Sequence, residues 1–152
     1  MRLVIAAVGK LKAGPIKSLY DDYAGRLPWP VTLKEIANRT DKSAAERKRR
    51  EGEALLAVIP DDAALVALDG RGRALASEAI AERLRAFRDS GTASLAFAIG
   101  GADGLDDAVR RRAALALAFG PQTWPHFLVR VMLAEQLYRA ATLLAGYPYH
   151  RG

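Results

Sequence analysis

Three short segments combine glycines with polar or aromatic residues in a way that suits a small-molecule site. Each follows an apolar run of the kind that forms a buried strand. The segments are residues 68–72 (LDGRG), 99–105 (IGGADGL) and 119–126 (FGPQTWPH). Ligands of open parallel sheets bind outside the carboxyl ends of the strands, so we expect the chemistry at these three loops.

The middle segment places Gly100, Gly101 and Gly104 between a strand and a helix. Bare backbone at these positions could approach a ligand closely and present N–H donors near a helix N-terminus. From their spacing alone, the same glycines rather favour a tight turn only. Their spacing is not the dinucleotide fingerprint, and the sequence contains no P-loop. These absences disfavour nicotinamide, flavin and nucleoside triphosphate as ligands.

The third segment contains a Gly-Pro and a Trp-Pro pair, which prevent it from forming regular helix or strand. A rigid loop that exposes its backbone suits adenine or ribose. The alternative is an ordinary connection in which His126 caps the next helix.

Charged and aromatic residues also gather near the end of the chain. Glu135 and Arg139 are four residues apart on an otherwise apolar helix. Such a pair stabilises a helix by about 0.3–0.5 kcal/mol, and on an apolar helix we expect it to be buried with partners or to lie in an interface. The final residues, 147–152 (YPYHRG), could stack on a base and pair with phosphate, although chain ends usually fray.

The elements that must position these residues alternate between strand and helix. Apolar runs closed by Gly, Pro, Asp or Asn predict strands at 3–8, 31–36, 64–68, 94–99 and 115–119. Helical patterns cover 15–27, 43–59, 77–88, 106–114 and 127–145. This alternation predicts an α/β fold, with a mostly parallel sheet flanked by helices in a single domain spanning 1–152.

Composition narrows the classes of function. The chain has 152 residues, of which 51% are hydrophobic, so it can form a globular core. It has no cysteine and two histidines, which excludes thiolate chemistry and makes a metal site unexpected. No apolar stretch is long enough for a membrane span, and we expect a cytoplasmic protein. The net charge of +6, concentrated in the first 50 residues, indicates either a nucleic-acid partner or a solvated surface.

Five segments together resemble one family over almost the whole chain. They are residues 3–12 (LVIAAVGKLK), 68–72 (LDGRG), 97–105 (FAIGGADGL), 123–140 (TWPHFLVRVMLAEQLYRA) and 149–151 (YHR). The family is the ribosomal RNA large subunit methyltransferase H family of the SPOUT superfamily. Its members methylate N3 of a pseudouridine in 23S rRNA.

This resemblance implies features that composition and spacing do not. The expected fold has a deep C-terminal trefoil knot, and the expected assembly is a homodimer acting on the assembled ribosome. The long last helix would lie in the interface, and the tail of one subunit would complete the site of the other. The family binds S-adenosylmethionine (SAM) in the knot without a metal. The residues expected around SAM here are Leu68, Gly100, Gly101, Gly104, Phe119, Gly120, Pro121, Gln122, Thr123 and Trp124.

A sulfonium methyl is already activated, so the reaction requires mainly alignment and removal of the imide proton. We expect Tyr149, His150 and Arg151 to position the extruded nucleobase and its phosphate, and His150 is the candidate for removing the imide proton. Arg139 is a further candidate catalytic residue. In the basic first third of the chain, Lys10, Lys12 and residues 47–50 (RKRR) are expected to dock on rRNA.

Two alternatives to the methyltransferase function are a flavodoxin-like nucleotide-binding enzyme and a non-catalytic ribosome-binding factor.

Overall fold

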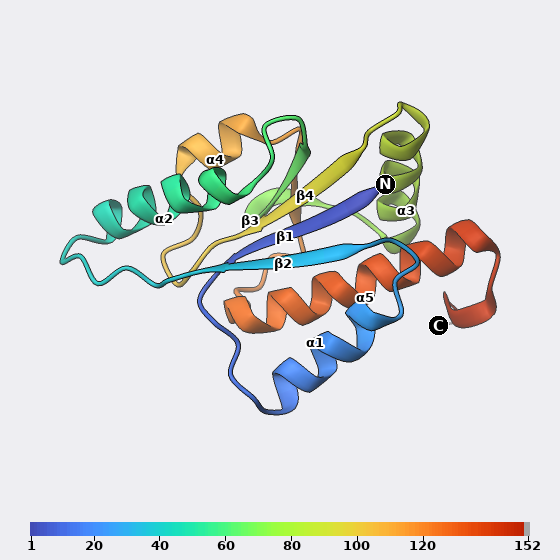
Figure 1. The fold of residues 1–152 in the computed structure, drawn as a ribbon, viewed down its shortest axis with the longest axis horizontal. Coiled ribbons are helices and arrows are strands. Elements are labelled where there is room, and N and C mark those ends of the chain that lie inside the picture. Colours follow the sequence, from blue (N-terminus) through green and yellow to red (C-terminus); the bar gives the residue numbers. More distant parts are fainter. Residues whose placement is uncertain (151–152) are drawn as a thin grey trace.

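The computed structural model describes residues 1–149 completely and residue 150 by its backbone. Five strands alternate with five helices along the chain (Figure 1). The strands are β1 (Arg2–Val8), β2 (Val31–Ile36), β3 (Ala64–Ala74), β4 (Ser94–Ile99) and β5 (Leu115–Ala118). The helices are α1 (Pro15–Gly25), α2 (Ala44–Val58), α3 (Ser77–Asp89), α4 (Asp107–Arg112) and α5 (His126–Ala145), and a short 3-10 helix, η1 (Pro148–His150), follows them.

All neighbouring strands are parallel, in the order β2-β1-β4-β3-β5. Helices α1, α3 and α5 cover one face of the sheet, and α2 and α4 cover the other (Figure 1). The central strands β1 and β4 are buried on both faces, which is why they are continuous apolar runs rather than alternating patterns. The predicted α/β class with a parallel sheet is confirmed.

The loops after β1 and β4 lead to helices on opposite faces of the sheet, although these two strands are neighbours. Such a switch point leaves a crevice at the carboxyl edge. The five predicted helices are all present, and their ends differ from the prediction by at most two residues. Within residues 1–150, no helix combines the length and the apolar character needed to cross a membrane.

One predicted boundary is wrong, because β3 continues to Ala74 instead of ending at Leu68. The strand pairs with β5 twice: Leu68 lies opposite Leu117, and Arg73 then lies opposite the same Leu117 after a register shift. The LDGRG segment is therefore strand with an irregularity, not a loop. Gly72 makes this possible, since a Cβ atom there would lie 2.6 Å from the backbone carbon of Ala116.

Candidate functional site

A cavity of about 810 Å³ opens between residues 68–70 in the middle of β3, the ends of β4 and β5, and the start of α5. Its volume is within the range of small-molecule sites. All ten residues named above for SAM line it: Leu68, Gly100, Gly101, Gly104, Phe119, Gly120, Pro121, Gln122, Thr123 and Trp124. Segments that are far apart in the sequence thus form one continuous wall.

The glycines of the 100–104 loop are required by the loop itself. A Cβ atom on Gly100 would lie 2.6 Å from the carbonyl oxygen of Gly104, so the two sides of the turn approach too closely for any side chain. Gly104 adopts a φ of 83° and donates its N–H to the Gly101 oxygen at 3.1 Å. These residues therefore form a tight turn, and the same turn forms part of the cavity wall.

The 119–125 loop is closed by a hydrogen bond as well as by its prolines. The indole Nε1 of Trp124 donates to the carbonyl oxygen of Phe119 at 2.9 Å, joining the two ends of the loop. Gly120 turns the chain with a φ of 94°. Trp124 remains 40% exposed, so its ring face is available to a ligand in the cavity.

The charge of the cavity wall is distinctive. Among the described residues that line it there is no lysine or arginine, whereas Asp69 and Asp103 both contribute. Burial opposes ionisation of Asp69, but hydrogen bonds from the Arg71 amide and the Arg110 guanidinium lower its pKa. The Arg47 guanidinium holds the pKa of Asp103 below its usual value. Both carboxylates are therefore ionised near neutral pH.

His126 also lines the cavity, a placement that the sequence left open. It does not cap α5, because the cap position is Pro125 and no side chain bonds there. Its ring packs on Phe127 with 4.3 Å between centroids. Burial and the nearby Arg130 cation lower the pKa of His126, so the imidazole is neutral at pH 7.

Two of the C-terminal candidates, Arg139 and Tyr149, form a separate cluster with Glu135. Arg139 donates to a Glu135 carboxylate oxygen at 3.0 and 2.7 Å, and the Tyr149 hydroxyl donates to the same oxygen at 3.2 Å. The Arg139 guanidinium also lies over the Tyr149 ring, 5.2 Å from its centroid. Burial, together with Tyr23 and Glu135, raises the pKa of Tyr149.

Within the same chain, Glu135, Arg139 and Tyr149 do not line the cavity of about 810 Å³. Glu135 instead lines a second cavity of about 620 Å³, which shares Ala118, Phe119 and Gly120 with the first. The His150 side chain and all of Arg151 lie outside the described residues. The described residues also contain no group of three or more acidic or imidazole side chains that could hold a metal ion.

The comparisons with known proteins agree over the whole chain. The family model for predicted SPOUT methyltransferases matches residues 1–150. Ribosomal RNA large subunit methyltransferase H of Rhodospirillum centenum is 60% identical over 151 residues, covering 99% of each chain. The proteins of the same name from Paramagnetospirillum magneticum and Nitrobacter winogradskyi are 55% and 50% identical, covering 99% and 100% of each chain respectively. The chain therefore belongs to the SPOUT methyltransferase family.

Proposed function

We propose that this protein transfers a methyl group from SAM to N3 of a pseudouridine in 23S rRNA, acting on the assembled ribosome. Membership of the methyltransferase family and the shared name of its close relatives support rRNA as the substrate. Because the proposed substrate is ribosomal, we infer that the protein acts in the cytoplasm.

The observation that carries the proposal is the cavity wall. Ligands with phosphate groups need cations or a phosphate-cradling loop, and the described lining supplies neither. SAM carries no phosphate, which suits a wall of bare glycine backbone whose two carboxylates, Asp69 and Asp103, are already paired with Arg110 and Arg47. When bound, SAM supplies the activated methyl group. The 100–104 and 119–125 loops, together with Leu68, would bind and orient it.

The double pairing of β3 with β5 supports the expected knot. Residues on both sides of the irregularity, Leu68 and Arg73, contact the same residue of β5, Leu117. Residues 68–74 therefore run beside β5 on both sides of the irregularity. We infer that the C-terminal part passes through a loop formed by this region, as the SPOUT resemblance implies.

Exposed apolar residues on α1 and α5 support the expected homodimer. Ile16 and Leu19 on α1 and Leu128 on α5 are 37%, 46% and 37% exposed. A second copy covering this face would bring its own tail toward the second cavity, next to Phe119 and Gly120. In this arrangement Tyr149, His150 and Arg151 of one subunit position the base for the other, with Arg139 holding the shared Glu135 carboxylate and His150 removing the imide proton.

SAM titration tests the cofactor site directly. Isothermal titration of the purified protein is expected to show saturable binding at about one site per chain. Ala102→Trp should abolish this binding, because Ala102 is exposed in the cavity wall and a tryptophan there would fill the space. Ala57→Trp, at an exposed position on α2, is the matched control and should bind normally.

The methyl-transfer step is tested on assembled ribosomes with labelled SAM, followed by mass spectrometry of the modified nucleoside. The product should be N3-methylpseudouridine. Absence of SAM binding both alone and with ribosomes would overturn the proposal and favour the non-catalytic ribosome-binding factor.

For rRNA docking, Lys10 and Lys12 are tested first among the expected residues. The 47–50 run is largely engaged within the molecule: Arg47 binds Asp103, while Arg49 and Arg50 both bind Glu46. Lys10 and Lys12 are exposed at the carboxyl edge, next to the crevice after β1.

We expect Lys10→Glu/Lys12→Glu to weaken ribosome binding and to reduce its logarithmic salt slope by about 0.7–0.9 per lost phosphate contact. Filter binding at several salt concentrations measures both quantities. Lys17→Ala is the control, because the Lys17 ammonium is already bonded to Asp21 at 2.6 Å. A double variant with the wild-type slope would remove these lysines from the interface.

A further inference from the structure

One face of α2 packs against the 100–104 loop, which forms part of the cavity wall. Arg47 donates through Nε and Nη2 to the two carboxylate oxygens of Asp103, at 2.9 and 3.2 Å. Its remaining nitrogen, Nη1, donates to the carbonyl oxygens of Asp41 at 2.7 Å and Lys42 at 3.2 Å. The guanidinium is thus fixed by the start of its own helix while it holds a residue 56 positions away.

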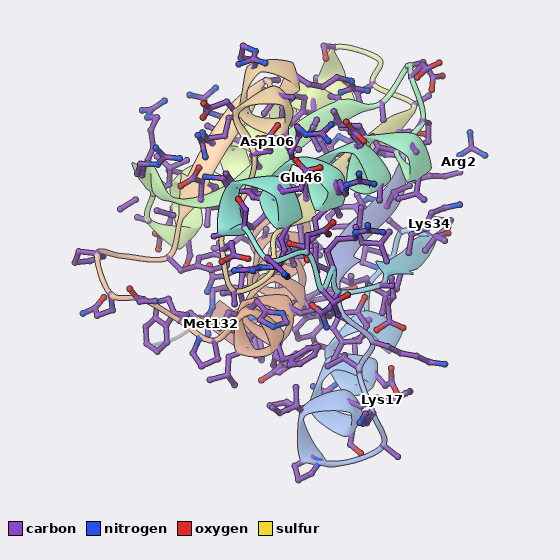
Figure 2. All side chains as sticks on the ribbon, turned by 90° about the vertical axis from the view of Figure 1, so that its left-hand side faces the viewer. Arg2, Lys17, Lys34, Glu46, Asp106 and Met132 are labelled. Atoms are coloured by element: carbon purple, nitrogen blue, oxygen red, sulfur yellow. The ribbon has the colours of Figure 1, made fainter. Side chains whose placement is uncertain are left out.

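Two further contacts lie one helical turn along the same face. Glu51 is 5% exposed, and a Cβ atom on Gly101 would lie 3.3 Å from its Oε2. A Cβ atom on Gly52 would lie 2.9 Å from the Cβ of Asp106, whose carboxylate caps α4. Figure 2 shows Glu46 of α2 and Asp106 on the same side of the molecule. Helix α2 therefore approaches Gly101 and Asp103 within the loop and Asp106 just after it.

The 100–104 loop needs these contacts because its own sequence allows many backbone conformations. Three of its five residues are glycines, which lose more backbone freedom on ordering than other residues. Asp103 is the charged residue of the loop, and Arg47 is its bidentate partner. The two side chains are 28% and 24% exposed, so solvent screens this pair less than a fully exposed one.

We propose that Arg47 is a positioning residue for SAM: through Asp103 it holds the 100–104 loop in the conformation that binds the cofactor. This inference rests on the proposed function, since it assigns a role within the same site. Arg47 is not among the described residues that line the cavity, and it reaches the cavity through Asp103. It therefore acts on the affinity for SAM and not on the transfer step.

A double-mutant cycle tests the role of the pair. Arg47→Ala and Asp103→Ala should each weaken SAM binding by about tenfold. The two substitutions should also show the non-additivity that is typical of residues in direct contact. The double variant should bind no more weakly than the weaker single variant, because both changes release the same loop. On ribosomes, each single variant should raise KM for SAM and leave kcat within about twofold at saturation.

Controls separate this role from general stability. Glu53→Ala removes an exposed carboxylate that bonds Arg49 on the same helix, and it should leave the SAM affinity unchanged. Arg47→Lys keeps the charge without the bidentate geometry, so its affinity should lie between wild type and Arg47→Ala. It also serves as the test variant if the alanine variant does not fold.

The possible failures are distinguishable. If the wild-type protein does not bind SAM, the proposed function fails. If the wild type binds and both Arg47→Ala and Arg47→Lys retain its affinity, the role of Arg47 fails. Multiplicative effects in the double variant, or a fall in kcat without a rise in KM, would likewise overturn it.

Discussion

Arg130→Ala is expected to lower the free energy of unfolding by about 3–5 kcal/mol, the range found when one partner of a buried ion pair is removed. Arg130 is fully buried on α5. Its Nη1 donates to Glu35 at 2.6 Å, and its Nη2 donates to the carbonyl oxygens of Gly9 at 3.0 Å and Val8 at 3.3 Å. The substitution would leave a carboxylate and two carbonyl groups without this partner at the edge of the sheet.

Urea denaturation followed by circular dichroism measures this loss. Arg85→Ala is the matched control, since Arg85 is 48% exposed and pairs with Glu82 on the surface at 3.5 Å. An exposed pair of this kind contributes about 0–1 kcal/mol. Equal unfolding midpoints for the two variants would show that the Arg130 network does not stabilise the fold.

The arrangement of strands and helices was predictable because it depends on local patterns. The apolar runs of β1 and β4 are bounded by turn residues, and they appear as strands at the predicted positions. The three segments could be placed together because parallel strands carry their ligand sites at one edge. The residues of the cavity wall were named with the help of the family resemblance.

What the sequence did not predict depends on contacts between distant residues. The extension of β3 pairs with β5, more than 40 residues later, and a segment rich in glycine does not indicate a strand. In the sequence Arg47 belongs to a basic run that is typical of a solvated surface, and only the fold brings Asp103 into contact with it. His126 and the buried Arg130 are likewise defined by their surroundings, which no local pattern encodes.

Gly72→Ala is expected to destabilise the protein by about 3 kcal/mol or more, at the upper end of overpacking effects. A Cβ atom at this position would lie 2.6 Å from the backbone carbon and 2.7 Å from the oxygen of Ala116, and 2.8 Å from the nitrogen of Leu117. All three are backbone atoms of β5, which cannot move aside as a flexible side chain can. The substitution must therefore separate the second pairing of β3 with β5. Urea denaturation gives the change in stability, and SAM titration of the folded fraction gives its effect on the site.

Gly70→Ala is the matched control from the same segment. Neither Gly70 nor Gly72 has a positive φ, so backbone strain does not distinguish them. The space around Gly70 is open, with no atom within 4 Å of a Cβ. Its substitution should change stability by less than about 0.5 kcal/mol. Because β5 leads directly into the 119–125 loop, the Gly72 variant should also bind SAM more weakly. The Gly70 variant tests whether an added methyl group in this segment is enough to weaken SAM binding. If the two alanine variants were equally stable, the close approach of β3 to β5 would not be what fixes this wall of the cavity.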